Sequence, residues 1–208
     1  YYRGHGSFSG LGSVGFNKDQ AQNLRNSNKY PVFFNFTCLT GTFAEHAKTN
    51  PCFSEYLLRM NNAGAVGVSG NSAVGWSPTT ESLAKGVFSS IYNDKISSVG
   101  DALTRGLLIM GSSSTYHEHM HKVTHYFGDP SMEIWTDVPT CFFPTITKEG
   151  SNIRVKTGGV SGCKVTICRI SDMTILSTST MSGSEGLFNV GNAPCYVTIT
   201  KHNYIPYV

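Results

Sequence analysis

The chain has 208 residues, of which 39% are hydrophobic and 14% are charged, and its formal net charge is +3. This share of apolar residues can build a packed core, which excludes an intrinsically disordered chain. Because there is no run of basic residues, the small positive charge indicates no nucleic-acid partner. The apolar stretches are far shorter than the roughly 20 residues of a membrane helix, so we expect no membrane span.

Up to about residue 139 the sequence alternates short apolar runs with helical patterns. Residues 31–36 (PVFFNF) form a continuous apolar run, which is typical of a strand buried on both faces of a parallel sheet. A second buried strand is predicted at 64–70 (GAVGVSG). Helices are expected at 52–64, 81–93, 97–111 and 114–127. This alternation predicts a doubly wound α/β sheet.

The pattern changes after the WTDVPT segment at 135–140, which we interpret as a linker. From Thr140 onward, short β-type runs are separated by Gly, Ser, Asn and Asp, without a helical stretch. Such a pattern is typical of a small antiparallel sandwich. The sequence therefore predicts an α/β domain at 1–138 and an all-β domain at 139–208.

The six cysteines form no CxxC pair, so neither a zinc ribbon nor a thioredoxin-type site is indicated. If Cys38 is a free nucleophile, the remaining five cannot all pair with one another. We expect most of them to be buried, reduced thiols.

Two residues stand out as a candidate catalytic pair. Cys38 directly follows the predicted strand at 31–36, and reacting groups collect at the carboxyl ends of strands in open α/β sheets. His5 lies between Gly4 and Gly6, and glycines let the backbone approach a substrate closely. Taken singly, Cys38 fits a buried thiol and His5 a surface histidine. Taken together, a thiol and an imidazole are what a cysteine peptidase requires.

The order of these features resembles the gingipain family of bacterial cysteine peptidases, in the caspase-like clan. The matching stretches are YRGHGS (2–7), FNFTCLTGTF (34–43), PCFSEYLLR (51–59), GAVGVSGNSAVGW (64–76), YFGDPSMEIWT (126–136) and ITKHNYIPYV (199–208). The resemblance covers nearly the whole chain. It implies a caspase-like, mostly parallel sheet followed by an immunoglobulin-like sandwich.

The resemblance also implies roles for individual residues. Cys38 matches the family's nucleophile and His5 its catalytic histidine, so the implied activity is that of a cysteine endopeptidase with a thioester acyl-enzyme. The oxyanion hole would consist of the backbone N–H groups of Gly6 and Cys38. Trp76 matches a tryptophan that lines the primary specificity pocket in arginine-cleaving members, although the residue alone also fits a loop-packing aromatic.

Specificity is less well defined by the sequence. A pocket for Arg or Lys needs a buried carboxylate. The resemblance places Thr79, with Glu81 close by, near the position from which one gingipain reads lysine, whereas the arginine-reading acid lies upstream of this chain. Glu81 also suits the first turn of the predicted helix at 81–93. Thr79 and Glu81 are kept as candidate substrate-binding residues, without support for basic specificity.

A histidine-rich segment offers a remote alternative. His117, His121 and His125 recur at every fourth position of the predicted helix at 114–127, a spacing that can bind zinc in a metal-dependent hydrolase. Because no carboxylate or thiol completes such a site, we interpret this face as an exposed helical surface and expect no metal. The peptidase implied by the resemblance needs no cofactor and leaves room for a structural calcium ion.

A caspase-like sheet has several strands before the one that carries the histidine, and here the histidine is residue 5. We therefore expect the chain to be one piece of a longer polypeptide cut upstream of Tyr1. Its partner would be the upstream piece, which would supply the acid that orients the histidine. An engineered fragment and an independently folding chain are the alternatives.

The implied substrate is a peptide or protein, and the implied location is secreted or at the bacterial cell surface. The rival function is that of a catalytically silent relative acting in secretion, adhesion or protein binding. The presence of both His5 and Cys38 in matching contexts favours the enzyme.

Overall fold

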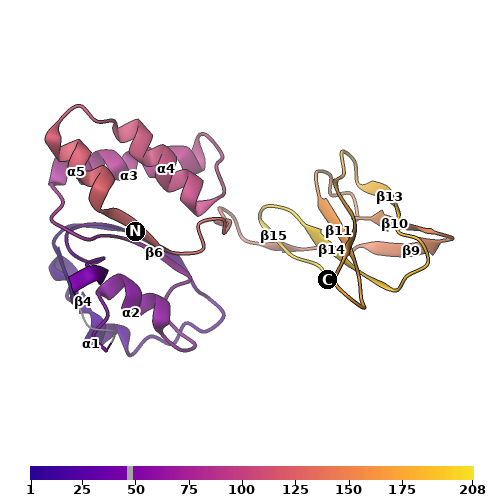
Figure 1. Cartoon of the computed structure of the whole chain (residues 1–208), viewed down its shortest axis with the longest axis horizontal. Helices are drawn as coiled ribbons and strands as arrows, with labels where there is room; N and C mark the ends of the chain where they lie inside the picture. The colour runs from indigo at the N-terminus through magenta and orange to yellow at the C-terminus, as the bar shows by residue number, and fades with distance from the viewer. Residues whose placement is uncertain (46–48) are drawn as a thin grey trace. The chain divides into compact units, whose positions relative to one another are not determined.

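The computed structural model describes residues 1–45 and 49–208. Its contacts divide the chain into two compact units, Tyr1–Ile134 and Trp135–Val208, while the sequence placed this boundary after residue 138. Each unit is described separately (Figure 1). No helix among the described residues is long and apolar enough to cross a membrane.

The first unit contains short strands at its start, then alternating strands and helices. In chain order its elements are β1 (Tyr2–Arg3), β2 (Gly6–Ser7), β3 (Gly10–Leu11), η1 (Gly12–Val14), β4 (Phe16–Asn17), α1 (Lys18–Ala21), β5 (Val32–Phe36), η2 (Phe43–Glu45), α2 (Phe53–Arg59), β6 (Gly67–Asn71), α3 (Ser77–Tyr92), α4 (Val99–Met110), α5 (Thr115–Val123) and β7 (Thr124–Gly128).

The main sheet of this unit has the strand order β1-β5-β6-β7. The pairs β1–β5 and β5–β6 are parallel, and β6–β7 is antiparallel. A separate small antiparallel sheet joins β2, β3 and β4. The predicted mixed α/β architecture with a mostly parallel sheet is confirmed.

Helices cover both faces of this sheet, because its central strands are apolar on both sides. Alternate residues of β5 face opposite ways, so Phe34 and Phe36 pack with helices α3 and α4, while Phe33 packs with α2. Figure 1 shows α3, α4 and α5 together on one side of β6, with α1 and α2 on the other. The predicted doubly wound arrangement follows from this two-sided burial.

Three predicted helices have clearly different limits in the structure. The helix expected at 52–64 is α2, which ends at Arg59. The helix expected at 114–127 ends at Val123, and the chain continues as strand β7 paired with β6. Its last residues are β-branched or aromatic (VTHYF), which favours an extended backbone where a strand partner is available. Helix α3 begins at Ser77 rather than at residue 81, with Pro78 in its first turn, where proline is well tolerated.

The second unit is built from short strands, which are antiparallel in its two larger sheets and parallel in a third sheet of two strands. They are β8 (Thr140–Cys141), β9 (Thr145–Glu149), β10 (Asn152–Lys156), β11 (Lys164–Arg169), β12 (Ile175–Thr180), β13 (Glu185–Asn189), β14 (Cys195–Thr200) and β15 (Tyr204–Ile205). The sheets β13-β10-β9 and β12-β11-β14 share one apolar core, in which Val155, Val165 and Ile199 are fully buried. The predicted antiparallel sheets are confirmed, and the immunoglobulin-like classification stays a prediction.

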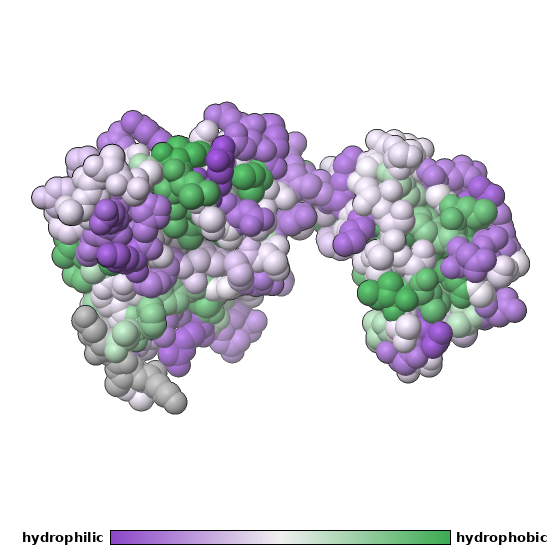
Figure 2. All heavy atoms as spheres, turned by 45° about the horizontal axis from the view of Figure 1, so that its top comes forward, coloured by the Kyte–Doolittle hydropathy of each residue, from purple (hydrophilic) through white to green (hydrophobic). Residues whose placement is uncertain are grey.

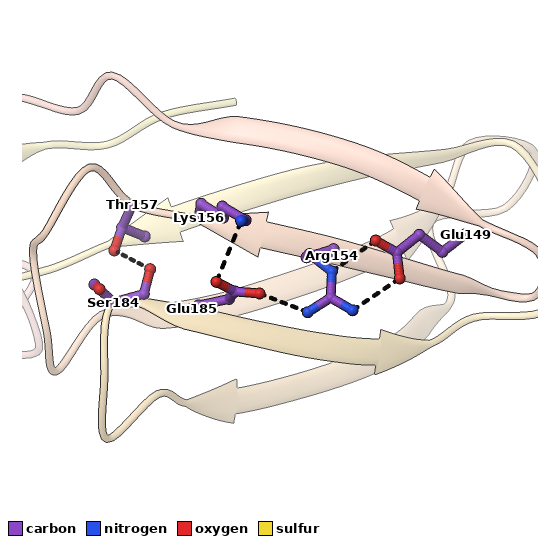
Figure 3. Close-up of polar contacts among 6 residues, drawn as sticks. All are labelled: Glu149, Arg154, Lys156, Thr157, Ser184 and Glu185. Carbon is purple, nitrogen blue, oxygen red and sulfur yellow. Dashed lines mark hydrogen bonds and ion pairs between the residues drawn. The ribbon is translucent and has the colours of Figure 1, made fainter.

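The face of β10 that points away from this core carries an ion-pair network (Figure 3). The Arg154 guanidinium lies 2.6 Å from a Glu149 oxygen and 2.5 Å from a Glu185 oxygen, and Lys156 lies 3.4 Å from Glu185. Because Glu149 is on β9 and Glu185 on β13, Arg154 links all three strands. Hydrogen bonds from Arg154 hold the pKa of both carboxyls below the ordinary value of 4.5.

The space-filling view shows mainly polar side chains around smaller apolar patches on each unit (Figure 2).

This network predicts a pH-dependent contribution to stability. A lowered carboxyl pKa in the folded state stabilises the fold above the unfolded pKa, and that contribution is lost as the pH falls through the folded pKa. We expect Arg154→Met to lower the denaturation midpoint slightly at pH 7, because exposed ion pairs are weak. The deficit should shrink at pH values well below 4.5. Urea denaturation at pH 7 and at low pH checks this, and an equal deficit at both would show that Arg154 acts by packing alone.

Candidate active site

The pairing of β1 with β5 brings His5 and Cys38 to one edge of the sheet. Tyr2 is in register with Asn35 and Arg3 with Phe36, in parallel orientation. His5 lies two residues past the end of β1, and Cys38 two residues past the end of β5. The two segments therefore leave the sheet side by side at its carboxyl edge, where ligands collect in open α/β folds.

The segment around His5 packs directly onto the segment around Cys38. The Thr37 hydroxyl donates a hydrogen bond to the Gly4 carbonyl, which links the two strand ends. A Cβ atom at Gly6 would lie 2.5 Å from Thr37 Cγ2 and 2.6 Å from the Cys38 carbonyl oxygen. Only glycine fits in this space, so the close approach explains the residue after the histidine.

The backbone of His5 is held at three points. Its carbonyl oxygen accepts hydrogen bonds from the Tyr2 hydroxyl at 2.9 Å and from the Gly12 amide at 2.8 Å, and its own amide lies 3.4 Å from the Ser13 hydroxyl. Within the described part of the chain no hydrogen bond engages the imidazole ring. The ring is therefore carried on a fixed backbone with both nitrogens available.

Cys38 is half-buried in a tight turn between β5 and residues 71–75. Leu39 has a left-handed backbone with φ of 57°, a conformation that costs an ordinary residue roughly 1–2 kcal/mol. The turn is held by hydrogen bonds from Leu39 N to the Ala73 carbonyl and from Gly41 N to the Asn71 carbonyl. Backbone strain of this kind concentrates at functional turns.

The sulfur atom of Cys38 contacts the backbone of Gly75. The Gly75 amide donates to Sγ at 3.3 Å, and the Gly75 carbonyl oxygen lies 3.4 Å from Sγ and can accept from the thiol. Together the two contacts hold the sulfur at this edge of the sheet. No pattern in the sequence indicates this contact, because the two residues lie 37 positions apart in the chain.

The other cysteines differ from Cys38 in environment. All six are free, Cys52 and Cys163 are buried, and Cys141 is exposed. Burial raises the pKa of Cys52 to about 11 and also raises the pKa of Cys163. The expectation that most of the cysteines are buried is therefore wrong, because only these two are. Both are poor nucleophiles, because the thiolate is the reactive form.

Trp76 follows Gly75 and belongs to an aromatic cluster. Its ring centroid lies 4.7 Å from that of Tyr116 and 4.8 Å from that of His119, both on α5. The Nε2 atom of His119 lies 2.9 Å from the Val74 carbonyl oxygen, which it reaches as a donor. Helix α5 thus supports the loop that contacts Cys38, and Trp76 remains 37% exposed.

Thr79 and Glu81 do not offer a free polar group to a substrate. Thr79 is buried, and its hydroxyl donates to the Trp76 carbonyl within the first turn of α3. Glu81 is the fifth residue of α3 rather than a first-turn residue, so that interpretation was wrong. One Glu81 oxygen lies 2.8 Å from Lys85 Nζ and the other 3.7 Å from Arg3 Nη1. Hydrogen bonding to Lys85 lowers the pKa of Glu81.

The structure does not place the three histidines of the zinc hypothesis on one helical face. His117 pairs with the Ser114 hydroxyl and His121 with the Gly111 carbonyl. His125 lies on β7 and contacts the Ser72 hydroxyl. Among the described residues, no group of three or more His, Cys, Asp or Glu side chains could hold a metal ion.

A thiol and an imidazole at one edge of an α/β sheet are the groups that a cysteine peptidase requires. Comparison with known proteins agrees with this class: the model of "Peptidase family C25" matches residues 1–135. The chain therefore belongs to peptidase family C25, the gingipain family that the sequence resembles.

Individual relatives come from Porphyromonas gingivalis. Gingipain R2 is 29% identical over 150 residues, covering 67% of this chain and 20% of that protein. Gingipain R1 is also 29% identical over 150 residues, and the match covers 67% of this chain and 15% of that protein. The crystal structure of the Arg-specific cysteine proteinase gingipain R (RgpB) superposes with a TM-score of 0.84 at 21% identity, covering 99% of this chain and 50% of that chain.

A second structure, the complex of the pro- and mature domains of RgpB, gives a TM-score of 0.83 at 21% identity, with coverage of 99% and 52%. The chain therefore spans a fifth or less of these curated relatives and about half of the solved chains. The structural match agrees with the fold, and it extends over both units.

Proposed function

We propose that this chain carries the nucleophile and the acid–base residue of a cysteine endopeptidase. His5 takes the thiol proton of Cys38, and the thiolate attacks the carbonyl carbon of a peptide bond. His5 then gives the proton to the leaving amine, which leaves a thioester on Cys38. A water molecule deprotonated by His5 cleaves the thioester, releases the carboxylic acid and restores the thiol. The observation that carries the proposal is the parallel β1–β5 register, which brings both residues to one edge.

Backbone amides provide the remaining chemistry in this proposal. The N–H groups of Gly6 and Cys38 would bind the oxyanion, and the packing of Gly6 on the Cys38 carbonyl supports this pairing. The Gly75 amide would stabilise the thiolate before attack. This chemistry requires no cofactor, and the structural calcium ion remains a prediction.

The substrate would be a peptide or protein. Trp76 would lie beside the substrate side chain that immediately precedes the scissile bond. Thr79 and Glu81 are the other two candidate substrate-binding residues. Thr79 would act only by holding the Trp76 carbonyl in place, and Glu81 would act through its charge. The upstream partner piece and the secreted or cell-surface location belong to the same proposal, supported by the relationship to the bacterial gingipains.

Selective alkylation tests this function. We expect a peptidyl acyloxymethyl ketone to modify Cys38 at least about tenfold faster than exposed Cys141, because a neighbouring imidazole increases the thiolate fraction. His5→Ala should remove this advantage. Mass spectrometry of the labelled peptides, with Cys141 as internal reference, gives the rates. Equal, slow labelling of Cys38 and Cys141 would contradict the proposal and support a catalytically silent relative.

A further inference from the structure

Arg3 places a positive charge beside the candidate active site. It is the last residue of β1, two positions before His5, and its Nη1 donates to the Ser77 hydroxyl at 3.0 Å. Ser77 directly follows Trp76. Gly75, the residue before Trp76, contacts Cys38 Sγ. The guanidinium is thus bonded to the first residue of α3, two positions after the residue that contacts the sulfur.

The charges around Arg3 do not cancel. Glu81 makes its closer ion pair with Lys85 at 2.8 Å and lies 3.7 Å from Arg3. One carboxylate therefore faces two cations, which leaves a net charge of about +1. The Arg3 side chain is 38% exposed, and a guanidinium has five N–H donors, so it can still bind a further acceptor.

The two residues that could have read a basic side chain do not provide a free carboxylate. The Thr79 hydroxyl is buried and donates to the Trp76 carbonyl, and the Glu81 carboxylate has Lys85 as its closer partner. Neither residue therefore supplies a free negative charge that would offset the repulsion between Arg3 and a substrate lysine or arginine. A substrate carboxylate would meet a planar donor that binds it in a bidentate fashion.

From this arrangement we infer that Arg3 makes the site select an acidic side chain, aspartate or glutamate, immediately before the scissile bond. The inference rests on the proposed function. That residue carries the carbonyl that Cys38 attacks, so its side chain is the one that falls among the neighbours of Gly75 and Trp76. This specificity differs from that of the solved relative, which is described as Arg-specific.

Matched peptide substrates test the inference on the full-length protein. The substrates differ only before the scissile bond, with Asp, Asn, Glu, Gln or Arg at that position. We expect each acid to exceed its amide in kcat/KM by about tenfold or more, as for hydrogen bonds to charged groups. Arg3→Gln should reduce this ratio about tenfold. Glu81→Gln, which removes the competing carboxylate, should increase it.

A charge-matched control separates local from general electrostatics. Arg105 on α4 pairs with Asp94 at 3.4 Å, after the far end of α3. Arg105→Gln removes the same charge and should leave the acid-to-amide ratio unchanged. If Arg3→Gln unfolds the protein, the higher acid-to-amide ratio of kcat/KM expected for Glu81→Gln still tests the inference.

Equal cleavage of acid and amide substrates, faster cleavage after arginine, or an acidic preference only at other positions would overturn the inference. So would a ratio that Glu81→Gln leaves unchanged. In each of these cases, selective labelling of Cys38 would leave the proposed function standing. If no peptide is cleaved and Cys38 is not labelled, both are overturned.

Discussion

Replacing Gly6 with alanine is expected to reduce kcat/KM for a peptide substrate by about a hundredfold. The added methyl group would meet the Cys38 carbonyl oxygen at 2.6 Å and Thr37 at 2.5 Å, distances that force the two strand ends apart. This displaces the Gly6 amide from the proposed oxyanion hole, and loss of one such donor costs roughly 10²–10³ in kcat. It also moves His5 relative to Cys38, and misplacement by about 1 Å can have a similar effect.

Gly12 provides the matched control for this substitution. Its amide donates to the His5 carbonyl, but a Cβ there would lie 3.5 Å from His5 Cβ, an ordinary contact. Gly12→Ala should therefore change kcat/KM by only a few-fold, with circular dichroism confirming that both variants are folded. Similar activities for the two variants would show that Gly6 does not set the geometry of the site.

The sequence predicted those parts of the fold that depend on local pattern. The apolar run before Cys38 predicted β5, because a strand buried on both faces is mostly apolar. Helix α4 followed from its periodic apolar residues, and Val99, Ala102, Leu103 and Met110 are indeed buried. The segment at 124–127 was predicted as the end of the helix at 114–127. Pairing with β6 decides its conformation, and no local pattern reports a strand partner.

Cys38 was identified because it follows a predicted buried strand, and His5 because it lies between two glycines and matches the gingipain pattern. Gly75, Arg3 and His119 were not, since each acts through a contact with a residue 37 to 74 positions away. In the sequence, Arg3 is distinguished only as a cation two residues before His5.

The close packing of α3 on α4 leads to the largest stability effect that we expect. A Cβ on Gly106 would lie 2.8 Å from the backbone nitrogen of Val87, and a Cβ on Gly86 would lie 2.6 Å from the Gly106 carbonyl oxygen. Two glycines therefore let the helix backbones touch above the core that holds Phe34 and Phe36. A methyl group at this point meets backbone atoms, which cannot rotate away as a side chain can.

Gly106→Ala should lower the free energy of unfolding of the first unit by about 2 kcal/mol. Overpacking costs typically 1–3 kcal/mol and more against backbone, whereas the gain in helix propensity returns only about 1 kcal/mol. Leu108→Ala, two residues further along α4, is the control: its side chain is 65% exposed, so its removal should change stability by less than about 0.5 kcal/mol. Urea denaturation of both variants measures the difference. Because adding one buried methyl group is expected to cost more than deleting an exposed leucine side chain, the opposite order would show that the helices can separate without loss of core packing.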